Sequence, residues 1–117
     1  MSEPGPAPRR AGGIAAAEAV ALAGLVDYAP GAVVSRALIQ SQPASVTLFA
    51  FDAGQGLNEH TTPYDAHVLV LDGVADWTIG GAAVTAKASE ILRLPASVPH
   101  AVDARERFKM LLIMVRA

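Results

Sequence analysis

Cysteine is absent from the 117-residue chain, and its absence removes three kinds of chemistry. The protein can form no disulfide, no thiolate zinc site and no cysteine nucleophile, so any metal must rest on histidine, carboxylate or other oxygen ligands. Proteins kept in a reducing compartment commonly lack disulfides, and we therefore expect a cytoplasmic protein.

Positive charge and long apolar runs are also scarce. Nine Lys and Arg against eleven Asp and Glu give a net charge of −2, which offers no extended surface for nucleic-acid phosphates. The apolar stretch that follows Arg9-Arg10 has the order of a signal peptide, but Glu18 interrupts it. The uninterrupted apolar run that remains is shorter than the roughly 20 residues needed to span a bilayer. We expect neither a nucleic-acid partner nor a membrane partner.

Apolar residues make up 52% of the chain and charged residues only 17%, enough to build one packed core. Residues 1–13 are rich in proline and glycine and predict a flexible N-terminal tail. Residues 14–117 then form a single domain. Within it, the alanine-rich residues 14–27 predict a short helix.

Short β-rich runs with period two fill the rest of the chain, and turn residues separate them. Such spacing without intervening helices predicts an all-β fold, an antiparallel β-sandwich or jelly-roll barrel. Gly80-Gly81 and Asp72-Gly73 are the clearest hairpin signals. Several runs are apolar on both faces, so we expect a homodimer. The predicted strands are residues 32–39, 45–52, 67–73, 74–81, 82–88, 90–95 and 108–115.

The chain contains three histidines, His60, His67 and His100, and no other reactive constellation. No GxSxG, HExxH or P-loop motif is present, and Gly54-Gln55-Gly56 lacks the glycine and helix of a dinucleotide site. His60 and His100 each follow a turn-rich loop. In an antiparallel barrel these two side chains would meet across the mouth.

The residues around these histidines resemble the two motifs of small single-domain cupins, over residues 32–117. Gly54, five residues and His60 match the start of the first motif, and Gly73 matches its end. In the second motif, Pro95 and Pro99-His100 fall at the expected intervals, with Ser89 at the position of the opening glycine. The resemblance implies a conserved barrel with a pocket.

Three positions depart from the cupin pattern. Thr62 stands in place of the second histidine, Ala66 in place of the glutamate, and Ala104 in place of the closing asparagine. Only His60 and His100 remain of the four ligands that the resemblance implies. They would bind a divalent ion such as nickel, iron, zinc or manganese, or form a hydrogen-bonded pair in a pocket without metal.

His67 follows the inward position of Ala66 directly. Alternation along a strand turns it to the outer face or a dimer interface, and only a bulge would return it to the pocket.

Other pocket residues follow from strand parity. Gln55, Asn58 and Thr62 are polar candidates, and Asn58 and Thr62 share the parity of His60. On the last strand Lys109 should face outward. Its alternation sends Phe108, Met110 and Met114 to the interior, together with Leu112.

Three functions are compatible with this pattern. The first is a pocket for a small organic molecule, with or without a divalent metal held by His60 and His100. The second is a metal-dependent enzyme, of the dioxygenase or isomerase type, acting on a small oxygenated substrate. The third is a dimeric structural barrel without ligand chemistry. The fold alone does not select among them, because one fold supports many activities.

Overall fold

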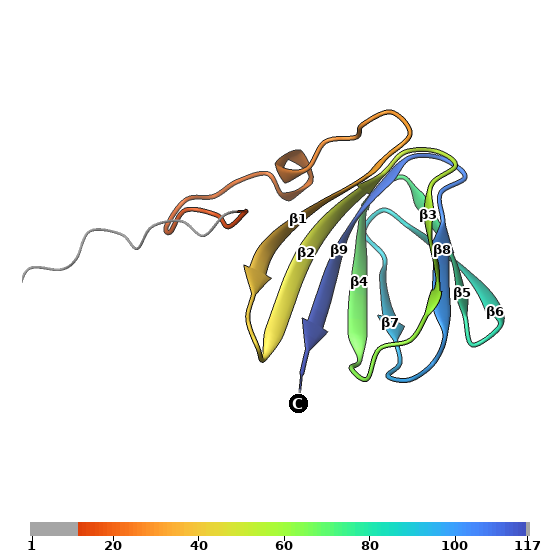
Figure 1. Ribbon diagram of the computed structural model, residues 1–117. Coiled ribbons are helices and arrows are strands. Elements are labelled where there is room, and N and C mark those ends of the chain that lie inside the picture. Colours follow the sequence, from red (N-terminus) through yellow and green to blue (C-terminus); the bar gives the residue numbers. More distant parts are fainter. Residues whose placement is uncertain (1–11, 117) are drawn as a thin grey trace, which may run out of the picture.

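A computed structural model describes residues 12–116, which form two antiparallel sheets packed face to face (Figure 1). One sheet has five strands in the order β1-β2-β9-β4-β7, and the other has four in the order β3-β8-β5-β6. The antiparallel β-sandwich predicted by the strand spacing is therefore confirmed. The strands are β1 (Val33–Gln40), β2 (Ala44–Phe51), β3 (Gly56–His60), β4 (Ala66–Asp72), β5 (Val74–Ile79), β6 (Ala82–Lys87), β7 (Ile91–Leu94), β8 (His100–Asp103) and β9 (Phe108–Val115).

Each of the seven predicted runs corresponds to one of these strands, but β3 and β8 were not predicted. Both are only four or five residues long, and each includes polar or charged side chains. The equally short β7 was visible because three of its four residues are apolar, whereas polar residues obscure the alternation in β3 and β8. The two strands that sequence patterning overlooks are also the two that contain His60 and His100.

The region before β1 is mostly extended. Residues 1–11 of the predicted tail lie outside the described residues. The helix expected within residues 14–27 is reduced to one 3₁₀ turn, Leu22–Leu25. Leu22, Leu25 and Val26 pack on the outer face of β2 and β9, against Leu48 and Leu111. An extended segment covers more of that sheet than a helix would, so burial overrides the helical propensity of alanine.

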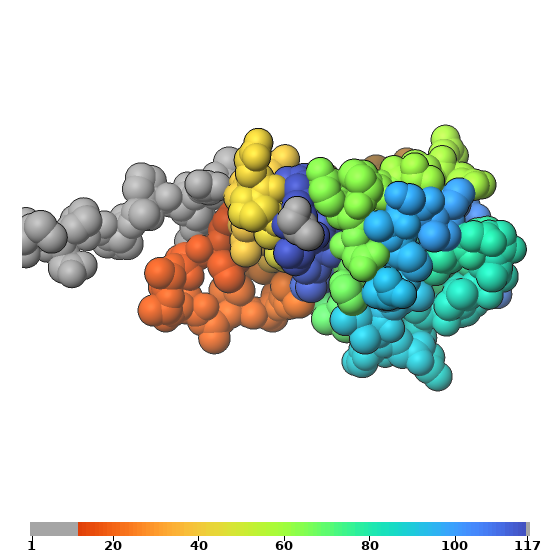
Figure 2. All heavy atoms as spheres, turned by 90° about the horizontal axis from the view of Figure 1, so that it is seen from below, coloured from red at the N-terminus to blue at the C-terminus, as the bar shows by residue number. Residues whose placement is uncertain are grey.

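Figures 1 and 2 show this N-terminal segment, in orange, lying beside β1 and β2 and away from β5 and β6. Arg36 holds it in place, since its guanidinium donates to the carbonyl oxygens of Gly12, Gly13 and Leu25 at 2.8, 3.2 and 3.1 Å. Part of the apolar outer face is therefore covered by the chain itself. Within residues 12–116, no helix is long and apolar enough to cross a membrane.

The main core lies between the two sheets. Phe51 and Phe108 are fully buried and stack with their ring centroids 4.5 Å apart. Val68 and Val70 on β4 and Val102 on β8 complete its centre. Burial of each such side chain contributes about 1.5–3 kcal/mol. Ala66, Trp77 and Leu94 belong to the same core cluster and also border a cavity between the sheets.

The two glycine turns have different roles. Gly80 and Gly81, at φ 56° and 82°, connect β5 to β6 as the predicted two-residue hairpin. Asp72-Gly73 does not form a hairpin, because β4 and β5 belong to different sheets. Gly73, at φ 73°, instead turns the chain from one sheet to the other, and a side chain there would collide with the Arg107 carbonyl. The sequence signal for a tight turn is the same in both cases.

Candidate functional site

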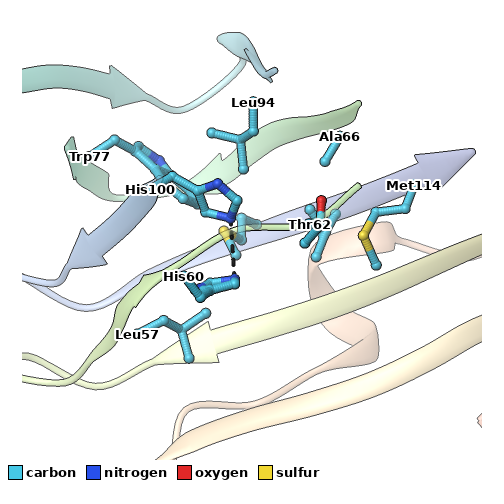
Figure 3. Close-up of a pocket in the computed structure, with 10 residues that line it drawn as sticks. Leu57, His60, Thr62, Ala66, Trp77, Leu94, His100 and Met114 are labelled. Atoms are coloured by element: carbon cyan, nitrogen blue, oxygen red, sulfur yellow. Dashed lines mark hydrogen bonds between the residues drawn. The ribbon is translucent and has the colours of Figure 1, made fainter. Parts of the chain in front are cut away.

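The imidazoles of His60 and His100 face each other across a short gap (Figure 3). His60 ends β3 and His100 begins β8, and the two residues are direct partners in the antiparallel ladder. Their Nε2 atoms lie 3.2 Å apart, with ring centroids 4.4 Å apart and planes at 69°. His100 is 4% exposed, while His60 lies at the solvent-accessible edge. The two histidines that the sequence predicted to meet are therefore neighbours in the structure.

A bulge in β3 aims His60 inward. The register shifts between Leu57, opposite Val102, and His60, opposite His100, so three residues of β3 span two of β8. A bulge of this kind puts two residues of odd separation on the same face. Leu57 and His60 therefore both line the cavity, whereas Asn58 is exposed and does not.

The second nitrogen of each ring fixes its tautomer. Nδ1 of His60 lies 2.8 Å from the Asn58 carbonyl oxygen, and Nδ1 of His100 lies 3.2 Å from the Val98 carbonyl oxygen. A carbonyl can only accept, so each Nδ1 must be the N–H donor. In two neutral rings both Nε2 atoms then present lone pairs to each other. Two facing lone pairs repel, and the contact becomes attractive only when a proton or another cation lies between them.

The His100 ring favours its neutral form. Burial lowers the pKa of His100, and the charge of a protonated His60 lowers it further, while the hydrogen bond to Val98 opposes the shift. Desolvation acts in this direction on any imidazole, because the cation is the form that loses hydration. The lone pair of His100 Nε2 is therefore available at neutral pH.

The imidazoles form the polar end of a cavity of about 90 Å³ between the sheets. Apolar side chains from both sheets make up most of its wall, and Thr62 adds one hydroxyl. Trp77 contributes its indole ring, 6.4 Å from the ring of His100. The lining residues are Leu57, His60, Thr62, Ala66, Trp77, Leu94, His100, Met110, Leu112 and Met114.

Several residues expected in the pocket line this cavity, and others do not. Thr62, Met110 and Met114 lie on its wall. Gln55 lies before β3, outside the lining, and Phe108 is fully buried in the core between the sheets. Asn58, expected on the same face as His60, does not share that face, because the bulge in β3 changes the alternation between them.

His67 is exposed on the opposite face of β4 from Ala66, as alternation requires. No described contact brings His67 to the two imidazoles.

Leu57 and Leu94 were missed at the sequence level. Leu94 could have been found, because Arg93 in the run EILRLP faces outward and therefore turns Leu94 inward. Leu57 could not, since its face depends on the bulge. Trp77 on β5 also lines the cavity and is 3% exposed. Its Nε1–H has no partner among the described residues.

Two loops at the cavity rim are tied together. The Ser97 amide donates to the Thr62 carbonyl at 2.7 Å, and the Ala96 amide donates to the Asp65 carboxylate at 2.7 Å. Ser97 adopts a left-handed conformation, φ 62°, that lets the loop close. These bonds hold Thr62 at the wall and keep the rim in one shape.

The fold and site define a small β-sandwich protein with a histidine pair in an interior pocket. A cupin-domain family model matches residues 47–116, and the chain belongs to the cupin family. The resemblance seen in the two histidine motifs is thereby confirmed. A comparison with curated proteins found no match.

Solved structures agree with this assignment. A conserved protein of unknown function from Streptococcus pyogenes is 34% identical, with 92% of this chain and 94% of that one covered and a TM-score of 0.86. A cupin superfamily protein from Desulfitobacterium hafniense is 30% identical, with coverage of 92% and 99% and a TM-score of 0.86. A conserved-barrel cupin from Leptotrichia buccalis is 41% identical over 81% of this chain and 46% of that one, with a TM-score of 0.79.

Proposed function

We propose that this cupin binds a small, largely apolar organic molecule in the cavity between its sheets, with His60 and His100 contacting the polar group of the ligand. One observation carries the proposal: an apolar wall closes around a few convergent polar groups, as is typical of small-molecule sites. A purely structural barrel has no need for a cavity at the end where its two histidines meet.

The size of the cavity limits the ligand. An apolar cavity of about 150 Å³ accepts benzene, and this one is about 90 Å³. A branched or linear group of about four carbons fits inside, with any larger part of the molecule extending past the rim. Burial of four methylene-sized groups at about 0.8 kcal/mol each supports affinities near the millimolar range for such a fragment.

Trp77 supplies a second polar requirement. Its Nε1–H is buried and unpaired among the described residues, and an unsatisfied buried donor costs about 1–3 kcal/mol. A ligand oxygen that reached this donor would recover that cost. The ligand we propose therefore combines a short apolar body with an oxygen or nitrogen group at the histidine end.

The divalent metal of the family pattern does not fit the donors on this wall. Thr62 and Ala66 replace two of the four ligands that the pattern requires, and the described lining residues include no carboxylate. A divalent site normally has at least three histidine, cysteine or carboxylate ligands. Within residues 12–116 no such group of three is found.

Three four-carbon probes test the proposal: butanol, butyrate and butylamine share a tail and differ in the charge of the head. Trp77 is the only tryptophan, so its fluorescence reports binding inside the cavity. We expect a saturable change with at least one probe in metal-free protein. Ala66→Leu, which fills the cavity, should abolish it, whereas Ala83→Leu on the exposed face of β6 should not. No saturation with any probe, or equal binding by Ala66→Leu, contradicts the proposal.

A further inference from the structure

The polar atoms on the cavity wall are unequally divided between hydrogen-bond acceptors and donors. Nδ1 of His60 and Nδ1 of His100 each donate to a backbone carbonyl, which leaves both Nε2 atoms as acceptors. The Thr62 hydroxyl donates to the Tyr64 carbonyl oxygen at 2.9 Å, so only its lone pairs remain for a ligand. Among the described lining side chains, Trp77 Nε1–H is the one nitrogen or oxygen donor left over. The wall therefore offers three acceptors and one donor.

We propose that the cavity selects uncharged ligands whose head group both donates and accepts hydrogen bonds, a primary amide or an alcohol, and that it rejects carboxylates. This inference rests on the proposed function and adds the chemical class of the head group. A primary amide has two N–H donors and one carbonyl acceptor, which complement the two imidazoles and the Trp77 indole. An alcohol has one donor and an acceptor oxygen, whereas a carboxylate has acceptors alone.

The spacing of the imidazoles suits a donor that they share. Their Nε2 atoms are 3.2 Å apart, so one ligand nitrogen or oxygen can lie at a hydrogen-bonding distance of about 3 Å from both. The hydrogens of such an atom place positive charge against two lone pairs that otherwise repel each other. A carboxylate oxygen at the same position would add negative charge to that repulsion.

The wall also has no group to neutralise an ionic head. The ten described lining residues include no Asp, Glu, Lys or Arg, and burial lowers the pKa of His100, which favours the neutral ring. Burying an unpaired carboxylate or ammonium costs far more than burying an amide or hydroxyl that is hydrogen-bonded. An ammonium could donate to the imidazoles, but it has no lone pair for Trp77 Nε1–H, which would stay unpaired.

Two pairs of four-carbon probes test the proposal on metal-free protein at pH 8, where free imidazole is neutral. Butyramide and butyrate have nearly the same shape and differ in donors and charge. The second pair, sec-butanol and methyl ethyl ketone, is uncharged and differs in the O–H donor. Trp77 is the only tryptophan, so its indole N–H resonance reports each titration by NMR.

We expect butyramide to bind at least about tenfold tighter than butyrate, and sec-butanol at least about fivefold tighter than methyl ethyl ketone, since each mismatch leaves polar groups unpaired. His60→Phe removes one acceptor at the exposed side of the pair. It should reduce the preference for sec-butanol over the ketone at least about threefold. His67→Phe, the same substitution on the exposed outer face of β4, is the matched control and should leave both preferences unchanged.

Different outcomes would overturn this inference and the proposed function. Butyrate that binds as tightly as butyramide, or a ketone that binds as tightly as the alcohol, would overturn the choice of head group and leave the pocket itself supported. An unchanged preference in His60→Phe would overturn the role of the imidazoles as acceptors. No saturable shift with any of the four probes would overturn both the inference and the pocket. Thermal unfolding of each variant shows whether the chain is folded.

Discussion

At the scale of single residues, the His60–His100 pair is the feature from which most of the chemistry follows. Each ring is tied to a backbone carbonyl through Nδ1, and the Nε2 atoms converge at 3.2 Å. The two rings therefore form one unit, in which a charge on one disfavours a charge on the other.

Acid should destabilise the protein through His100. Its pKa is lowered by burial, so between the ordinary value of 6.5 and the lowered value the unfolded chain binds the proton that the folded protein excludes. The free energy of unfolding contributed by this group is complete above pH 6.5 and is lost as the pH falls through the lowered pKa. Urea unfolding at pH 7.5 and 5.0 should show a smaller loss in His100→Gln than in the unsubstituted protein.

His67→Gln is the control for this experiment, since His67 is exposed on the outer face. An acid-induced loss of stability that is the same in His100→Gln as in the unsubstituted protein would show that His100 is not its source.

Ser89 stands where the family motif has glycine. Its backbone conformation explains why glycine is favoured at this position. Its φ of 73° lies in the left-handed region, which costs a non-glycine residue about 1–2 kcal/mol. Ser89→Gly should therefore raise the free energy of unfolding by about 1 kcal/mol in urea unfolding. Ala88→Gly, one residue earlier in the same turn, should lower it. A stability loss in Ser89→Gly would contradict this account.

At the scale of elements, the β3 bulge and the N-terminal segment have the largest consequences. The bulge turns Leu57 and His60 to one face, which alternation alone forbids. The N-terminal segment covers the outer face of β2 and β9, and the Arg36 guanidinium holds three of its carbonyls.

Arg36→Met should release this segment. The substitution keeps much of the apolar stem but removes three charge-assisted hydrogen bonds, each worth about 1.5–3 kcal/mol. Water can bond to the freed carbonyl oxygens in the variant, so the net loss is smaller than the sum. We expect a loss of about 2–4 kcal/mol in urea unfolding and faster amide exchange at Leu25 and Val26. Arg93→Met removes only the exposed ion pair with Asp65, and it should cost less than about 1 kcal/mol. Equal losses in the two variants would mean that Arg36 does not hold the N-terminal segment in place.

At the scale of the whole molecule, the segment leaves one apolar strip of the five-stranded sheet uncovered. A cross-strand row runs from Leu111, beside the segment, through Leu69 to Ile91, which is 64% exposed. A two-fold axis would let this row pack on its own copy, because such an interface is self-complementary.

We expect a homodimer through this strip. Light scattering should give about twice the 12.0 kDa of one chain, and Ile91→Lys should reduce the mass to that of a monomer. Val84→Lys, on exposed β6 of the other sheet, should leave the dimer intact. A monomeric unsubstituted protein at about 100 μM, a concentration at which a stable dimer is complete, would contradict the expectation.

The sequence by itself determined the β-sandwich, seven of its strands and the pairing of His60 with His100, because period-two burial and motif spacing are local properties of the chain. It also determined that His67 faces away from Ala66. The tertiary structure alone decided the rest. The β3 bulge arises from pairing with β8, the Asp72-Gly73 corner from strands in different sheets, and the cavity wall from side chains as far apart in the chain as Leu57 and Met114. These features depend on long-range register, which no local pattern encodes.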